Sequence, residues 1–147
     1  MDALELLKRD HEKVRELFRE VEEAKDPKKR KQLFDQIDTE LEVHTHIEET
    51  VFYPAMEQHD ELKDMVAEAR EEHEEVKTLL EEIEDLAPDD EEFDSKLQLL
   101  IENVEHHVEE EEEEMFPKVR EICDERALTR LGKQLEAAKG KQQRAAS

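Results

Sequence analysis

Apolar residues recur every three or four positions along most of the chain, which predicts a protein built of amphipathic helices. The first stripe contains Leu4, Leu7, His11, Val14, Phe18 and Val21. Asp2 stands just before it as an N-cap, and Glu5 follows three residues later as its capping-box partner. A first helix is therefore predicted to begin directly after Asp2.

A second helix is predicted from the Asp26-Pro27 pair to about Met56. Asp26 is a favourable N-cap, and proline is favoured at the first helical position. The stripe of this helix contains Leu33, Ile37, Leu41, His44, Glu48 and Val51. Pro54 should kink or terminate the helix, because proline lacks a backbone N–H and its ring clashes with the preceding turn.

The second half of the chain repeats this organisation. A third helix is predicted from about Glu61 to Leu86, and the turn Ala87-Pro88-Asp89-Asp90 then offers a new N-cap. A fourth helix follows and should stop at Pro117. A fifth helix is expected from Val119 to about Ala138.

These elements predict an all-α fold, an up-down four-helix bundle with an additional C-terminal helix. The domain is expected to comprise residues 1–138, with residues 139–147 as a flexible tail. A plain acidic coiled coil is the alternative. Prolines and capping residues at these intervals argue against one continuous rod.

Composition agrees with a helical bundle and narrows the partners. The 147 residues include 45 acidic and 22 basic side chains, for a formal charge of −23. Nucleic acid and anionic membrane surfaces both require basic patches, so neither is expected as a partner, whereas cations are favoured. No apolar run approaches the 18 residues that a membrane span would need.

The start of the chain is charged and periodic, unlike a signal peptide. The single cysteine, Cys123, cannot form a disulfide within the chain, so a reducing cytoplasm is the expected location. A catalytic thiol is not expected, because no histidine stands at a useful spacing from Cys123. The sequence leaves the oligomeric state open and is compatible with a monomer.

The two halves of the chain contain an internal repeat. DHEKVRELF at residues 10–18 aligns with EHEEVKTLL at 72–80. HTHIEETVFYP at 44–54 aligns with HVEEEEEEMFP at 107–117. Each half thus contains a helix with one histidine, followed by a helix with the pattern His-x-x-x-Glu.

This repeat sorts the seven histidines of the chain. Those that fall on the repeat and interrupt an apolar stripe are His11, His44, His73 and His107. A single histidine on an apolar face is usually a core residue with satisfied hydrogen bonds. Four of them, two with a carboxylate one turn away, are expensive to bury unless a metal compensates.

The spacing suits a pair of metal ions. His44 with Glu48, and His107 with Glu111, lie at i and i+4 and therefore on one helix face. Four imidazoles and two carboxylates are too many ligands for one ion of about six positions, whereas two ions bridged by both carboxylates fit. Within the run Glu109–Glu114, Glu111 matches Glu48 of the repeat. Glu114 also shares the face of His107 and ranks second, and the other four glutamates should lie in solvent or near the site.

The Glu-x-x-His pattern of the ferritin-like di-iron bundles does not occur in this chain. In both motifs here the histidine comes first and the glutamate follows one turn later. The combined motifs over residues 3–117 instead resemble the hemerythrin-like family of His-His-Glu cation-binding domains. That resemblance implies a four-helix bundle around two iron ions with a bridging oxo or hydroxo group. It also implies terminal ligands at His11, His44, His73 and His107, and bridges at Glu48 and Glu111.

One position departs from the oxygen-carrying members of that family, which have a second histidine where this chain has Lys77. About two coordination positions would then remain open, which favours peroxide or nitric oxide chemistry over reversible dioxygen binding. His46, His59 and Tyr53 are candidates to replace the missing ligand or to lie beside the metals. On an ideal helix Tyr53 points about 180° away from His44, so a core aromatic is the simpler reading.

Three functions agree with the sequence. The first is a di-iron protein, and possible oxidoreductase, that reacts with peroxide, dioxygen or nitric oxide in stress defence. The second is a module for oxygen binding, storage or sensing, or for holding iron without turnover. The third is a structural bundle with zinc or an adventitious metal.

Overall fold

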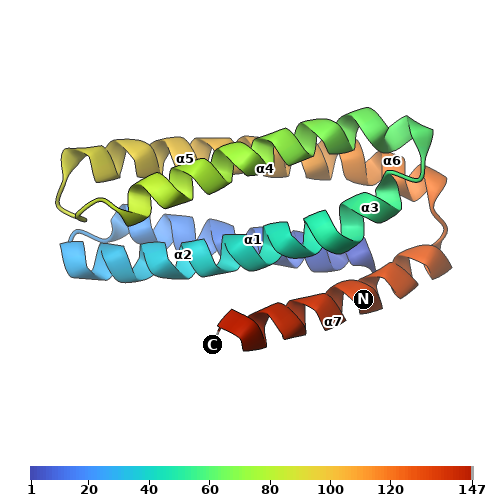
Figure 1. The fold of residues 1–147 in the computed structure, drawn as a ribbon, viewed down its shortest axis with the longest axis horizontal. Coiled ribbons are helices and arrows are strands. Elements are labelled where there is room, and N and C mark those ends of the chain that lie inside the picture. The colour runs from blue at the N-terminus through green and yellow to red at the C-terminus, as the bar shows by residue number, and fades with distance from the viewer. Residues whose placement is uncertain (147) are drawn as a thin grey trace.

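The computed structural model describes residues 1–146 as a four-helix bundle with an additional helix along one side (Figure 1). The four long helices are α1 (Ala3–Glu23), α2 (Pro27–Ile47), α4 (Lys63–Glu84) and α5 (Glu91–Glu110). The shorter elements are η1 (Glu48–Phe52), α3 (Tyr53–Met56), η2 (Asp60–Leu62), η3 (Glu111–Met115) and α6 (Phe116–Ile122), and the final helix is α7 (Glu125–Ala146). The predicted all-α bundle is confirmed. Over the described residues, no helix is long and apolar enough to cross a membrane.

Aspartate side chains begin three of the long helices, as the sequence predicts. Asp2 accepts a hydrogen bond from the backbone N–H of Glu5 at 2.9 Å. Asp26 and Asp90 cap α2 and α5 in the same way. Each cap satisfies a backbone donor that the first helical turn leaves without a partner.

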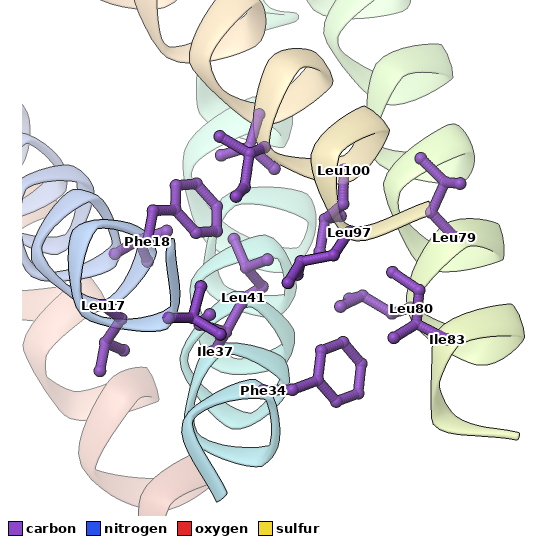
Figure 2. Packing of buried hydrophobic residues seen from close by; sticks show 14 of the residues in the cluster. Leu17, Phe18, Phe34, Ile37, Leu41, Leu79, Leu80, Ile83, Leu97 and Leu100 are labelled. Carbon is purple, nitrogen blue, oxygen red and sulfur yellow. The ribbon is translucent and has the colours of Figure 1, made fainter. Parts of the chain in front are cut away.

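Two apolar layers form the core. One layer surrounds Phe18, Phe34 and Phe93 near the α1–α2 and α4–α5 turns, and Figure 2 shows side chains such as Phe18, Ile37, Leu80 and Leu97 converging from the four long helices. The other layer contains Phe52 and Phe116 at the opposite end of the bundle. The four repeat histidines fall between the two layers on each helix, so the polar groups of the bundle lie in its middle.

Pro117 does not end its helix, contrary to the sequence expectation, whereas the helical segment that contains Pro54 ends at Met56, as predicted. Before each proline the backbone widens into a π-helical turn, in which the N–H of Tyr53 bonds to the carbonyl of Glu48 and that of Phe116 to the carbonyl of Glu111. A wider turn moves the proline ring away from the carbonyl that it would meet in a regular helix. The chain therefore continues in helical form through Pro54 and Pro117.

The fifth helix also begins later than predicted. Instead of starting at Val119, the chain breaks at Cys123 and Asp124, and the Asp124 side chain caps α7 by accepting from Ala127 N–H at 2.8 Å. The helix α7 lies against α1, α2 and η1 (Figure 1). It extends to Ala146, across most of the segment expected to be a tail, and Lys139 in that segment forms an ion pair with Asp10.

The two glycines of α7 provide a test of this packing. A Cβ on Gly132 would lie 2.5 Å from the carbonyl oxygen of Met1, whereas the nearest atom to one on Gly140 is 3.5 Å away on the Arg144 side chain. Gly132→Ala is expected to lower the free energy of unfolding by about 1–3 kcal/mol through steric overlap. Gly140→Ala should raise it by about 0.5–1 kcal/mol, because alanine favours a helix. Urea denaturation of both variants measures the difference, and equal effects would contradict this placement of α7.

Candidate metal centre

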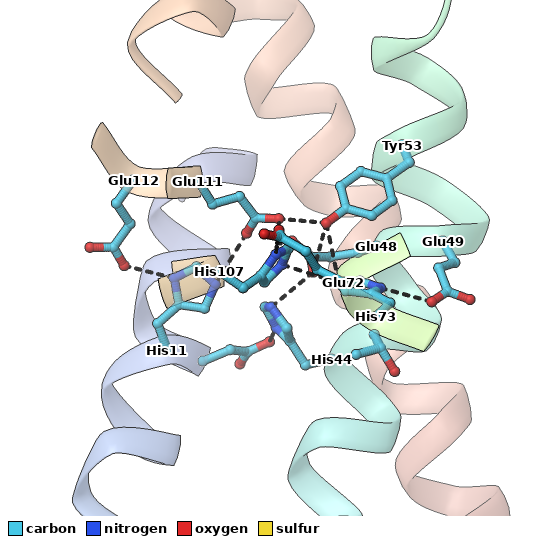
Figure 3. A network of polar contacts seen from close by, with 12 residues as sticks. His11, His44, Glu48, Glu49, Tyr53, Glu72, His73, His107, Glu111 and Glu112 are labelled. Carbon is cyan, nitrogen blue, oxygen red and sulfur yellow. Dashed lines mark hydrogen bonds and ion pairs between the residues drawn. The ribbon is translucent and has the colours of Figure 1, made fainter. Parts of the chain in front are cut away.

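All six candidate ligands meet in the middle of the bundle (Figure 3). They come from α1, α2, α4 and α5 and from the first residues of the two π-helical turns. Their exposed fractions are 2% for His11, 5% for His44, 0% for Glu48, 1% for His73, 6% for His107 and 2% for Glu111. The centre is thus a buried polar layer inside an otherwise apolar core.

The six side chains form two groups that share both glutamates. One group is His11, His44, Glu48 and Glu111, and the other is Glu48, His73, His107 and Glu111. Within each group the ligand atoms all lie within 4.8 Å of one another. This arrangement is what two adjacent cations bridged by two carboxylates would require.

Each glutamate reaches one histidine of each group. Glu48 Oε1 lies 3.2 Å from His44 Nε2 and 3.1 Å from His73 Nε2. Glu111 lies 3.3 Å from His11 Nε2 through Oε1 and 3.2 Å from His107 Nε2 through Oε2. Both glutamates therefore point between the two groups, and neither belongs to one group alone.

The hydrogen bonding of these atoms fits a cation. Five buried side-chain atoms in the described part of the chain have no hydrogen-bond partner, and four of them belong to this cluster. They are His11 Nε2, His44 Nε2, Glu48 Oε2 and Glu111 Oε1. A buried polar atom without a partner costs about 1–3 kcal/mol. Imidazole nitrogens and carboxylate oxygens are also ligands that iron and other first-row metals accept.

A second set of carboxylates orients the four imidazoles through Nδ1 (Figure 3). The pairs are His11 with Glu112 at 2.7 Å, His44 with Asp10 at 3.0 Å, His73 with Glu49 at 2.7 Å and His107 with Glu72 at 2.7 Å. Such a bond fixes the ring so that Nε2 faces the centre, and it makes the imidazole a better ligand.

Three of these four carboxylates were not predicted from the sequence, and Glu112 was expected to lie either in solvent or near the site. The repeat contains the signal that could have found them. It aligns Asp10 with Glu72, each just before a histidine, and Glu49 with Glu112, each just after a bridging candidate. What the sequence alone does not show is that Glu49 and Glu112 each hold a histidine of the other half.

Neighbouring charges shift the pKa values of the side chains in the cluster. Burial alone lowers the pKa of His44, but the charge of Glu48 and the hydrogen bond with Asp10 outweigh it and raise the pKa to about 10. Burial by itself raises the pKa of Glu111, yet the neighbouring His107 and His11 hold it well below the ordinary value. A cation that binds through Nε2 must therefore displace protons from these imidazoles.

Lys77 occupies the position at which the oxygen-carrying members of the family have a second histidine. Its Nζ lies 2.8 Å from Glu49 Oε1, and the other oxygen of Glu49 holds His73. The hydrogen bond with His73, helped by the one from Lys77, lowers the pKa of Glu49 to about 2 despite its partial burial. Lys77 thus supports the candidate ligand His73 through Glu49, from outside the centre.

Tyr53 reaches the centre, which the ideal-helix argument did not predict. Its hydroxyl donates to Glu111 Oε2 at 2.5 Å, and Glu48 Oε1 and His73 Nε2 lie within 3.3 Å. The π-helical turn takes up one additional residue, which turns Tyr53 back by about 100° relative to His44. Burial, with the charges of Glu111 and Glu48, raises the pKa of Tyr53 well above its usual value, so the hydroxyl keeps its proton.

The remaining candidates lie outside the cluster. His46 is exposed on α2. His59 lies at the end of the bundle, and its Nε2 is 3.7 Å from Cys123 Sγ, although no histidine stands at a useful spacing from Cys123 along the chain. Glu114 is exposed on η3, while Glu111 in the same run is buried.

Comparison with known proteins agrees with this geometry. The hemerythrin HHE cation binding domain matches residues 2–119, and the chain therefore belongs to the hemerythrin HHE cation-binding family. A crystal structure of a hemerythrin HHE cation binding domain-containing protein from Mycobacterium kansasii aligns with a TM-score of 0.87 and 28% identity, covering 99% of this chain and 90% of that one.

Two curated relatives are longer than this chain. A protein of Nostoc sp. named DNA nickase is 32% identical over 141 residues, which span 96% of this chain and 40% of the relative. An uncharacterized hemerythrin-like protein of Schizosaccharomyces pombe is 27% identical over 133 residues, or 89% of this chain and 66% of the relative. The chain thus spans less than two thirds of the length of either.

The raised pKa of His44 predicts how the free energy of unfolding depends on pH. His44 has a folded pKa of about 10 against an ordinary 6.5, so its proton stabilises the folded chain fully below pH 6.5. That contribution should be lost as pH rises toward 10 in protein prepared without metal. Thermal unfolding between about pH 6 and pH 10 measures the loss. Metal-saturated protein is the control and should lose less, because its ligands carry no protons.

The outer carboxylates should control metal affinity. Glu112→Gln replaces a charged acceptor of His11 Nδ1 with a neutral one, and metal affinity is expected to fall about 10- to 100-fold. Glu109→Gln removes the same charge from an exposed position on α5 and should leave affinity within about twofold of wild type. Competition titration with a chelator measures both. Equal losses in the two variants would mean that net charge, and not the orientation of His11, sets the affinity.

Proposed function

We propose that this chain is a non-heme di-iron protein that reacts with a small oxidant or gas, namely peroxide, dioxygen or nitric oxide, in stress defence. The observation that carries the proposal is the pair of buried ligand groups that share Glu48 and Glu111. The proposed cofactor is two iron ions with a bridging oxo or hydroxo group. His11, His44, His73 and His107 would be its terminal ligands.

A ligand count favours a reactive centre. Two six-coordinate ions have about twelve positions, of which four histidines, two bridging carboxylates and one bridging oxygen fill about ten. Iron at such a centre supplies one-electron redox chemistry toward small oxidants. Tyr53 has the reach either to hold Glu111 by a hydrogen bond or to take an open position itself.

A small apolar cavity supports the choice of substrate. It has a volume of about 20 Å³ and touches all four histidines. Its other walls are Val14, Leu41, Thr45, Val76, Val104 and Val108. One water molecule needs about 10–15 Å³, so the cavity is of the size that suits a diatomic molecule or peroxide.

The alternatives are oxygen binding, storage or sensing, or holding iron without turnover. The relative named DNA nickase does not add nucleic-acid cleavage to these functions, because the carboxylates around the centre would repel a phosphodiester. Asp10, Glu49, Glu72 and Glu112 all lie within hydrogen-bond distance of the candidate ligands. We further propose a cytoplasmic location, since the one cysteine, Cys123, is a free thiol.

Metal analysis with a visible spectrum tests the proposal. Protein loaded with ferrous iron should bind two ions per chain and, after oxidation, show charge-transfer bands that change when peroxide or nitric oxide is added. Zinc in place of iron, or no reaction with either molecule, would contradict it. A long-lived oxygen adduct without peroxide turnover would favour the oxygen-binding alternative.

A matched pair of variants tests the ligand assignment in the same assay. Glu111→Ala removes a buried shared carboxylate and should lose iron, whereas Glu114→Ala removes an exposed one and should retain both ions. If Glu111→Ala kept both irons, the assignment would fail.

A further inference from the structure

A pocket between α4 and α5 connects the surface with the centre. It has a volume of about 30 Å³, and His107 and Glu111 are among its lining residues. Its other polar walls are Glu68, Glu72, Glu110 and Glu114. Glu68 and Glu114 are exposed, Glu72 and Glu110 are half-buried, and the two candidate ligands are buried. Carboxylates of increasing burial, together with Met65, Ala69 and Met115, therefore line the pocket from solvent to the centre.

The internal repeat shows that this lining belongs to one half only. The alignment that pairs His73 with His11 and His107 with His44 also pairs Glu68, Glu110 and Glu114 with Leu6, Ile47 and Val51. Leu6 and Ile47 are buried, and all three belong to the apolar cluster that includes Leu128, Leu131 and Leu135 of α7. The equivalent groove between α1 and α2 is thus apolar and covered by α7 (Figure 1).

A partly exposed group of cation-binding side chains stands at the open pocket. Glu72, His106 and Glu110 bring one ligand atom each within 4.8 Å of the others. His106 Nε2 is 2.9 Å from Glu110 Oε1. Glu72 also holds His107 Nδ1, at 2.7 Å from its Oε1. The repeat aligns His106 with the buried Val43, so the covered groove has no such group.

The pocket also reaches a buried candidate ligand that has one oxygen without a hydrogen-bond partner. Glu111 lines it, is 2% exposed, and carries the buried Oε1 for which no hydrogen-bond partner is found. A row of carboxylates that ends at such an atom differs from an ordinary solvated acidic face. It offers a cation successive ligands of increasing burial.

We propose that the pocket between α4 and α5 is the path by which a divalent cation reaches the centre, with Glu72, His106 and Glu110 as a transit site. The proposal rests on the proposed metal centre. An acidic cleft concentrates cations and speeds their association by about 10- to 1,000-fold, while uncharged molecules such as dioxygen or peroxide gain no such advantage. The helix α7 covers the equivalent groove of the other half, so that groove offers no such path.

Stopped-flow mixing of metal-stripped protein with Co²⁺ tests the path, because cobalt absorbs visible light when histidine and carboxylate bind it. The variants Glu68→Gln/Glu114→Gln and His106→Ala leave every proposed ligand of the centre in place. Each is expected to load about tenfold more slowly than wild type at low salt. The final cobalt content should stay unchanged, and added salt should slow wild type more than the double variant.

The matched control is Glu105→Gln/Glu109→Gln, which removes the same charge from exposed positions outside the pocket lining. It should load at close to the wild-type rate. If both pocket variants loaded as fast as this control, the proposed path would be wrong. If wild type bound no Co²⁺ at all, the proposed metal centre itself would fail. Thermal unfolding of each variant shows that a slow rate does not come from a damaged fold.

Discussion

The structure depends on the burial of four imidazoles and two carboxylates in the middle of a helical bundle. Polar groups of this kind are costly in an apolar core unless each finds a partner. Here every imidazole uses Nδ1 for an outer carboxylate and turns Nε2 inward, toward Glu48 or Glu111. The apolar layers on both sides then hold the helices at the spacing that these contacts need.

The π-helical turns connect this requirement to the local backbone. Both turns begin at a shared carboxylate, Glu48 or Glu111, and both are followed by a proline. The wide turn accommodates the proline and also rotates the next residues relative to the histidine one turn earlier. One consequence is that Tyr53 reaches Glu111, although a regular helix would direct it away.

The two halves of the bundle are similar in sequence but not equivalent in chemistry. Tyr53 of the first half aligns with Phe116 of the second, and Phe116 stacks on His11 with ring centroids 6.2 Å apart. The Tyr53 hydroxyl contacts both shared glutamates, but among the four histidines it bonds only to His73. The two ligand groups therefore differ in their neighbouring side chains, and α7 covers the groove beside only one of them.

The four long helices, the caps at Asp2, Asp26 and Asp90, and the six side chains that meet at the centre could be predicted from the sequence. This was possible because hydrophobic periodicity identifies the inward face of each helix, and the internal repeat separates four histidines from the other three. Tertiary structure decided the π-helical turns, since their additional residue leaves no mark on a periodic pattern. It also decided the bonds that Glu49 and Glu112 make across the two halves, and the groove that α7 covers. Those features depend on how helices pack in space, and no local spacing along the chain records that.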